Sequence, residues 1–74
     1  VEARLAEALL ALAEEGLVRA THQDLAARIG SAREVVSRRL ESFAREGWVA
    51  TERGAVRILD PAALRRLAAT AAPG

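Results

Sequence analysis

Residues 21–40 read THQDLAARIGSAREVVSRRL, and this stretch decides the fold. Thr21 suits a helix N-cap, and Asp24, three residues later, gives a weaker form of the capping box. The apolar residues at helical spacing behind this cap are Leu25, Ala26 and Ile29. Gly30 is predicted to end the helix, because a left-handed backbone is easiest for glycine.

A second helix start follows at once. Ser31 and Glu34 form an S-x-x-E capping box, which predicts a helix from there to about Glu46, with Gly47 after it. Its buried stripe is predicted to be Val36, Leu40 and Phe43. A turn of only a few residues between two helices makes their axes cross steeply, which is the helix-turn-helix arrangement.

Downstream, the pattern changes from helical to alternating. Residues 48–51 (WVAT) and 55–59 (AVRIL) flank Glu52-Arg53-Gly54, which predicts a hairpin with glycine at a positive backbone angle. Asp60 as N-cap and Pro61 at the first helical position predict a last helix. Leu64 and Leu67 are expected to pack that helix against the core, and residues 72–74 are expected to fray.

Upstream, residues 2–15 predict a helix in which leucine recurs at helical spacing, and Gly16 is expected to stop it. The leucines are Leu5, Leu9 and Leu12. Residues 17–20 suit a short strand that can join the hairpin as a third antiparallel strand. We therefore predict one domain, residues 1–74, mainly α with a small antiparallel sheet: a winged helix-turn-helix. The helix-turn-helix spans about 22–46, the wing hairpin about 48–59 and the C-terminal helix about 61–71.

Composition excludes several classes of protein. Seventy-four residues allow one modest core and no active site between domains. The chain has no cysteine and one histidine, so we expect no disulfide, no metal site and no cofactor in this domain. Without cysteine or tyrosine, little is left from which to build a catalytic site, so we expect no enzyme activity. No apolar run is long enough to span a membrane and no signal-peptide pattern opens the chain, so we expect a cytoplasmic protein.

Charge is distributed unevenly along the chain. Net charge is only +1, yet residues 1–18 sum to −3 and residues 19–57 to +3. All of the basic residues are arginine. This segregation suggests one face toward a polyanion and another facing away, although solvated surfaces of ordinary proteins commonly show as much.

The third helix carries the candidate base-reading residues. At 100° per residue, Glu34 and Arg38 lie opposite the buried Val36, Ser37 lies on the flank and Arg33 projects from the first turn. A helix lying in the major groove presents its N-terminal residues to base edges. Arginine can bond both guanine acceptors, glutamate can accept from the cytosine amine and serine is adaptable. We predict that Arg33, Glu34, Ser37 and Arg38 read bases.

A structural explanation competes with this one. Glu34 with Arg38, and Glu41 with Arg45, have the spacing of stabilising i, i+4 ion pairs on a solvated helix. The two explanations are compatible, because a free-state pair can be replaced by bases on binding. Arg39, beside the buried stripe, suits either a surface-covering role or a DNA contact.

Flanking groups are candidates for holding the phosphate backbone. The start of the second helix offers free backbone N–H groups at Thr21, His22 and Gln23, where the helix dipole favours a phosphate. For His22, a surface or capping role is the alternative. Arg53 and Gly54 at the hairpin tip can reach a neighbouring phosphate, although Arg-Gly is also ordinary turn chemistry. Ser31, at the start of the third helix, completes the predicted backbone contacts.

The stretch 21–40 closely resembles the helix-turn-helix of the Crp/Fnr family of bacterial transcription regulators. The pattern T-x-x-[DE]-[LI]-A/G…G-x-x-R-E-[TV]-[VI]-[SG]-R is matched almost throughout, and the glycine-led GWV and the ILDP ending are similar too. In that family the winged helix follows a sensor domain and a dimerisation helix. The resemblance implies sequence-specific binding of double-stranded DNA as half of a homodimer, on a pseudo-palindrome with a TGA-like half-site core. It also implies contact with RNA polymerase.

The resemblance carries Arg33, Glu34 and Arg38 over as base-reading residues, and Ser37 matches a position where some members use serine at a base edge. His22, Gln23 and the hairpin tip match phosphate-contacting positions. The chain departs from the family at Ala32 and Val35, where members often carry hydroxyl residues. We therefore expect a weaker hold on the DNA backbone at these positions, and Val35 is instead a candidate for contact with a thymine methyl. The competing function is a winged helix used for protein contact without DNA, which a mobility-shift assay distinguishes.

Overall fold

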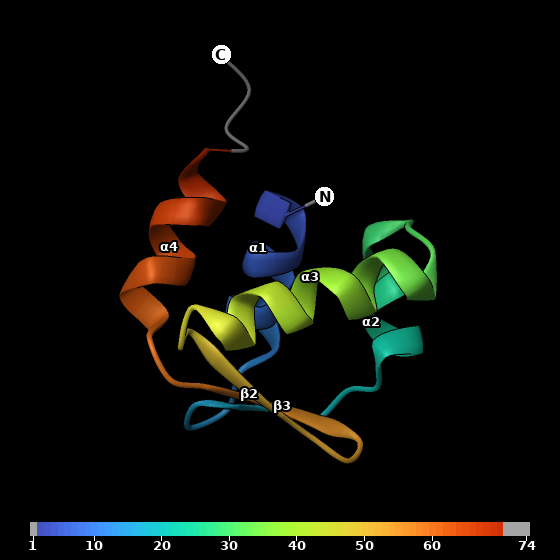
Figure 1. Cartoon of the computed structure of the whole chain (residues 1–74), viewed down its shortest axis with the longest axis horizontal. Helices are drawn as coiled ribbons and strands as arrows, with labels where there is room; N and C mark the ends of the chain where they lie inside the picture. The colour runs from blue at the N-terminus through green and yellow to red at the C-terminus, as the bar shows by residue number, and fades with distance from the viewer. Residues whose placement is uncertain (1, 71–74) are drawn as a thin grey trace.

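The computed structural model describes residues 2–70. Its elements, in chain order, are α1 (Glu2–Leu12), β1 (Leu17–Val18), α2 (His22–Ile29), α3 (Arg33–Arg45), β2 (Val49–Glu52), β3 (Ala55–Ile58) and α4 (Pro61–Ala69). Figure 1 shows α3 lying across the front of the molecule, with the sheet below it and α4 to one side. This order and architecture confirm the predicted mainly α fold with a small sheet.

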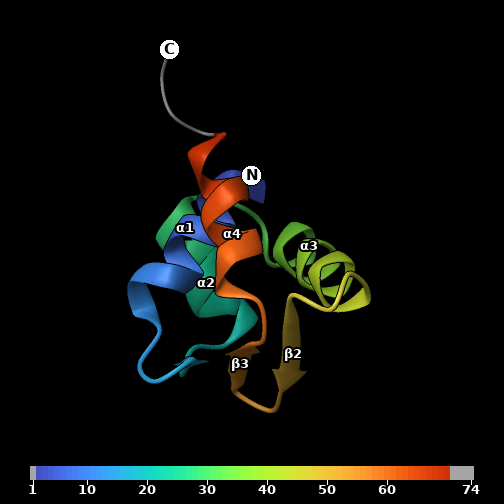
Figure 2. The ribbon, with the colours of Figure 1, turned by 90° about the vertical axis from the view of Figure 1, so that its left-hand side faces the viewer.

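The core lies where the inner faces of the helices meet the sheet. Helix α1 packs most extensively against α4 and also contacts α2, while α3 contacts α2 and β2 (Figure 2). The largest buried side chains are Phe43, Leu5, Leu9, Leu25, Leu40 and Leu64. The predicted stripe of α3 is confirmed, because Val36, Leu40 and Phe43 are all buried. Leu12, Ile29 and Leu67, also expected inside, are only partly buried and pack on the rim of this core.

Two glycines end helices as the sequence predicts. Gly30 has φ 68° and donates its N–H to the carbonyl of Ala26 at the end of α2. Gly47 has φ 81°, and the next residue, Trp48, donates its N–H to the carbonyl of Phe43, 3.0 Å away. This bond, reaching back five residues, closes the last turn of α3. The rings of Phe43 and Trp48 also pack together, with centroids 5.6 Å apart.

The first helix is shorter than expected. It ends at Leu12 rather than at residue 15. Glu14 and Leu17 exchange backbone hydrogen bonds of 2.9 and 3.0 Å, so the chain reverses between them in a tight turn. Both central residues of that turn have positive φ, 55° at Glu15 and 80° at Gly16. Gly16 is left-handed as predicted, but it belongs to this turn and does not cap the helix.

The sheet has the order β1-β3-β2, so β3 lies in the middle and pairs antiparallel with both neighbours. The predicted third antiparallel strand is therefore confirmed, although β1 holds only two residues. Register places Val18 opposite Val56 and Thr51 opposite Val56 on the other side. Val18, Val49 and Val56 are buried, so one face of the sheet closes the core beneath the helices.

Helix α4 begins as the sequence predicts. Asp60 accepts a hydrogen bond from the N–H of Ala63, 3.1 Å away, and Pro61 occupies the first helical position. The helix ends at Ala69, near the expected residue 71; the fraying expected at 72–74 lies outside the described residues. Within residues 2–70, no helix is long and apolar enough to cross a membrane.

Candidate nucleic-acid interface

The start of α2 is held by a complete capping box, stronger than the weaker form expected. The Thr21 hydroxyl accepts from the N–H of Asp24, and the Asp24 carboxylate accepts from the N–H of Thr21, both at 3.0 Å. The backbone N–H of Thr21, followed by its side chain, holds the pKa of Asp24 below its ordinary value. Two of the N–H groups at this end are thus occupied, which leaves those of His22 and Gln23 for an external anion.

The start of α3 differs from the prediction. The N-cap is Ala32, with φ −78° and ψ 145°, and no side chain caps the helix. Ser31 does not start α3 because its N–H donates to the carbonyl of Ala26, 2.9 Å away, and so closes the end of α2. The predicted capping box between Ser31 and Glu34 is therefore wrong. The backbone N–H groups at the start of α3 therefore have no capping side chain as an acceptor.

Three of the four predicted base-reading side chains are exposed on α3. Arg33, Glu34 and Arg38 project from the first turns of the helix, whose outer side no other element covers (Figure 1). Within residues 2–70, none of them forms a salt bridge or a side-chain hydrogen bond. The two ion pairs expected from the i, i+4 spacing, Glu34–Arg38 and Glu41–Arg45, are therefore not formed.

Ser37, the fourth predicted base reader, is half-buried and has a partner on the neighbouring helix. Its Oγ lies 2.8 Å from Nδ1 of His22 in a hydrogen bond between α2 and α3. Sequence reasoning placed the two residues in separate roles and missed this contact. The signal was present in the pattern, since Ser37 flanks the buried stripe and His22 opens the helix that packs against it.

Arg39 is not part of the exposed group. Its guanidinium Nη1 lies 3.0 Å from the Glu2 carboxylate, and the pair joins α3 to the start of α1. Both side chains are nearly half exposed, at 45% and 49% of their surface. The sequence left Arg39 between a surface role and a DNA contact, and the structure gives it a protein partner.

The hairpin tip projects beyond the sheet, below α3 in Figure 1. Arg53 and Gly54 form its two-residue turn, both exposed, with Gly54 at φ 70° as predicted. Behind the tip, the Arg57 Nε donates to the Glu52 carboxylate at 2.9 Å on the outer face of the hairpin. Arg57 is thereby partly neutralised, whereas Arg53 has no salt-bridge partner among residues 2–70.

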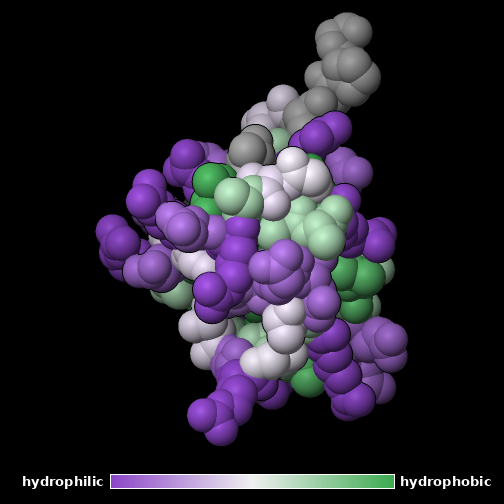
Figure 3. All heavy atoms as spheres, turned by 90° about the vertical axis from the view of Figure 1, so that its right-hand side faces the viewer, coloured by the Kyte–Doolittle hydropathy of each residue, from purple (hydrophilic) through white to green (hydrophobic). Residues whose placement is uncertain are grey.

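Hydrophilic residues cover much of the side of the molecule on which α2 lies, with less polar areas between them (Figure 3). The residues predicted to hold phosphate come from two places on the fold, the start of α2 and the hairpin tip, while the predicted base readers stand on α3. The hydrogen bond between His22 and Ser37 thus joins α2 to α3. Arg53 lies apart from them, in the turn between β2 and β3.

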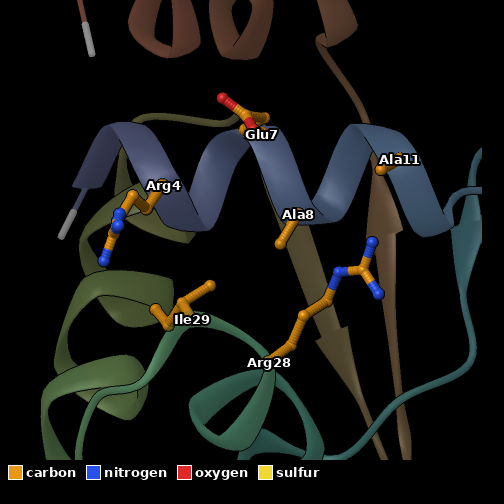
Figure 4. A pocket seen from close by; sticks show the side chains of 6 residues that line it. All are labelled: Arg4, Glu7, Ala8, Ala11, Arg28 and Ile29. Atoms are coloured by element: carbon orange, nitrogen blue, oxygen red, sulfur yellow. The ribbon is translucent and has the colours of Figure 1, made fainter. Parts of the chain in front are cut away.

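A hollow of about 420 Å³ opens elsewhere, between α1 and α2 (Figure 4). It is lined by Arg4, Glu7, Ala8, Ala11, Arg28 and Ile29. Its titratable side chains are one carboxylate, Glu7, and two guanidinium groups, Arg4 and Arg28. Within residues 2–70, no three His, Cys, Asp or Glu side chains gather where they could hold a metal ion.

Comparison with known proteins agrees with this geometry. Residues 3–67 match the model of the Crp-like helix-turn-helix domain. This chain belongs to that family. The transcriptional regulator SdrP of Thermus thermophilus is 42% identical over 72 residues, which are 95% of this chain and 36% of that protein.

Solved structures show the same relationship. A Crp/Fnr-family transcriptional regulator of Thermus thermophilus is 38% identical, with a TM-score of 0.86 over 93% of this chain and 40% of that one. The catabolite activator protein of the same organism is 39% identical, with a TM-score of 0.85 over 96% and 35%. The Crp-like chain therefore corresponds to little more than a third of each relative. It is a helix-turn-helix domain of the kind found in DNA-binding transcription regulators.

Proposed function

We propose that this Crp-like domain binds double-stranded DNA sequence-specifically, with α3 lying in the major groove. The observation that carries the proposal is the outer side of α3, where Arg33, Glu34 and Arg38 are exposed and form no side-chain bond within residues 2–70. Charged side chains without partners at the start of an uncovered helix are available for base edges. The relatives, which are named as transcriptional regulators, support the same function.

The proposed contacts divide by chemistry. Arg33 and Arg38 donate to guanine, Glu34 accepts from a cytosine amine and Ser37 bonds a base edge from the flank. Phosphates are held by the start of α2, where the N–H groups of His22 and Gln23 remain unused, and by Arg53 and Gly54 at the wing tip. The hydroxyls of Thr21 and Ser31 add to this grip.

The wider setting is proposed from family membership. The domain serves a cytoplasmic regulator that binds as a homodimer to a pseudo-palindrome with a TGA-like half-site core and contacts RNA polymerase. Neither catalysis nor a cofactor belongs to this domain's role. Two-fold symmetry matters because a second domain linked to the first binds its half-site at a high effective concentration. A single domain on a single half-site binds without that gain in affinity.

Selection of bound duplexes from random DNA tests the function directly. At low salt, where phosphate contacts are strongest, we expect the chain to enrich one half-site motif. The triple variant Arg33→Ala, Glu34→Ala, Arg38→Ala should lose the motif, whereas Arg65→Ala, Arg66→Ala removes two exposed arginines from α4 and should keep it. Folded protein that enriches no motif would overturn the proposal and favour a protein-contact module.

A further inference from the structure

The hydrogen bond between His22 and Ser37 joins two residues whose proposed partners are different parts of DNA. His22 is the first residue of α2 and Ser37 lies in the middle of α3, with Nδ1 and Oγ 2.8 Å apart and partly buried. Within residues 2–70, it is the only side-chain hydrogen bond between the two helices. A hydroxyl held in this way cannot rotate freely to suit any base.

The direction of the bond decides what Ser37 offers to a base. A hydroxyl has one hydrogen and two lone pairs, and a neutral imidazole has one N–H and one bare nitrogen. If Nδ1 carries the proton, Ser37 accepts from His22 and keeps its hydrogen for a base. If Nδ1 is bare, Ser37 donates to His22 and presents only lone pairs.

The proposed phosphate contact of the other ring nitrogen gives the bond its direction. Nδ1 is occupied by Ser37, so only Nε2 is left for a phosphate at the start of α2, where the helix dipole favours an anion. A phosphate oxygen accepts and never donates, so a phosphate bound at Nε2 requires the proton to be on that nitrogen. In a neutral ring Nδ1 is then bare, and the Ser37 hydroxyl must donate to it.

We propose that His22 is a positioning residue that fixes Ser37 as a hydrogen-bond acceptor toward DNA. Ser37 then selects a base that presents an exocyclic amine in the major groove, adenine N6 or cytosine N4, and rejects the acceptor edges of guanine and thymine. The inference rests on the proposed function, because it concerns how the same interface chooses its base.

Substitutions of His22 separate its two nitrogens. His22→Asn keeps an acceptor oxygen near the position of Nδ1 but loses the Nε2 donor. His22→Gln places an amide donor near Nε2 but removes the acceptor that holds Ser37. Ser37→Ala removes the hydroxyl itself. Melting curves for all three establish that each variant is folded.

The assay measures binding to half-site duplexes that carry each of the four bases at each position, at pH 8. We expect the chain to prefer an amine-bearing base at one position by about three- to tenfold, the effect of a single net hydrogen bond. Ser37→Ala and His22→Gln should lose that preference at that position alone. His22→Asn should keep it while binding all sequences more weakly.

Nitrogen NMR provides a second readout that does not depend on variants. His22 is the only histidine in the chain, so its ring nitrogens are assigned without ambiguity. We expect a protonated Nε2 and a bare Nδ1 in the DNA-bound chain. A protonated Nδ1 in the complex, or a His22→Gln variant with unchanged base preference, would overturn the inference and leave sequence-specific binding intact. Failure of the unaltered chain to bind any duplex would instead overturn the proposed function.

Discussion

The guanidinium of Arg39 and the carboxylate of Glu2 lie 3.0 Å apart, so an ion pair links the middle of α3 to the first residue of α1. Both side chains are nearly half exposed. Water therefore screens the attraction, and the pair contributes little to the stability of the fold.

Loss of the ion pair between Arg39 and Glu2 should have only a small effect on stability. We expect Arg39→Ala to lower the free energy of unfolding by less than about 1 kcal/mol, as for other solvent-exposed ion pairs. Because Arg39 is assigned to protein and not to DNA, the variant should retain its base preference. Thermal melting and binding to a selected half-site measure the two effects. A change in which base is preferred would place Arg39 in the reading surface.

Arg38→Ala and Glu34→Ala should separate binding from stability. No ion pair joins these residues in the described chain, so we expect unfolding to change by no more than about 1 kcal/mol, including the helix-dipole contribution of Glu34. Binding should fall by about 1–3 kcal/mol, with preference relaxed at one base position. Early melting with intact discrimination of a G·C pair would assign both residues to structure, and Arg33 would become the first candidate reader.

Arg53→Ala should weaken binding to every sequence about equally. Arg53 is exposed at the hairpin tip, away from α3, so its proposed partner is a phosphate. We expect the slope of log affinity against log salt to fall by roughly one. Titrations at several salt concentrations, on a good and a scrambled half-site, measure it. Altered sequence preference would show that the wing reads bases.

The turn between α1 and β1 offers a stabilising substitution. Glu15 has φ 55°, a left-handed conformation that costs a residue of this kind about 1 kcal/mol. Asparagine tolerates that conformation, so Glu15→Asn should raise the free energy of unfolding by about 0.5–1 kcal/mol. Glu14→Asn removes the same charge at a residue without positive φ and is the matched control. If Glu15→Asn and Glu14→Asn change the free energy of unfolding in denaturant by the same amount, the effect comes from the lost charge and not from the backbone conformation.

Acid should weaken the start of α2. The pKa of Asp24 is lowered in the folded chain, chiefly by the Thr21 backbone N–H, so its carboxylate stabilises the fold. That contribution is complete above the unfolded pKa and is lost as the pH falls through the folded value, below about pH 4. Asp24→Ala should therefore reduce the decrease in the free energy of unfolding that accompanies a fall in pH below about 4. Thr21→Val keeps the backbone N–H and should retain most of that pH dependence. An unchanged pH dependence in Asp24→Ala would show that this carboxylate is not its source.

Local signals predicted most of the fold. Glycine at 30 and 47, Asp60 before Pro61 and the apolar stripe of α3 each act through the residue's own conformational preference or a neighbour a few positions away. The capping box at Ser31 failed because the Ser31 N–H donates to the carbonyl of Ala26 in the preceding helix and is not available to Glu34. The first helix is shorter than predicted because Glu14 pairs with Leu17 across a tight turn, a local contact that competes with the helix.

The candidate site was predictable only in part. Helical geometry alone exposed Arg33, Glu34 and Arg38 on one side of α3. The same geometry allowed Glu34 to pair with Arg38, but spacing cannot determine side-chain conformers, and the pair is not formed. The contacts of Arg39 with Glu2 and of His22 with Ser37 join separate helices, so they depend on packing that no short stretch of sequence contains.

The sheet order β1-β3-β2 imposes an order of assembly on the molecule. Leu17 and Val18 pair with Arg57 and Val56, so the first strand to be synthesised waits for the last. During translation the helix-turn-helix is complete while β1 still has no partner, and only the arrival of β3 closes the core beneath it. A ribosome-bound chain that ends before β3 therefore carries α3 above an incomplete sheet.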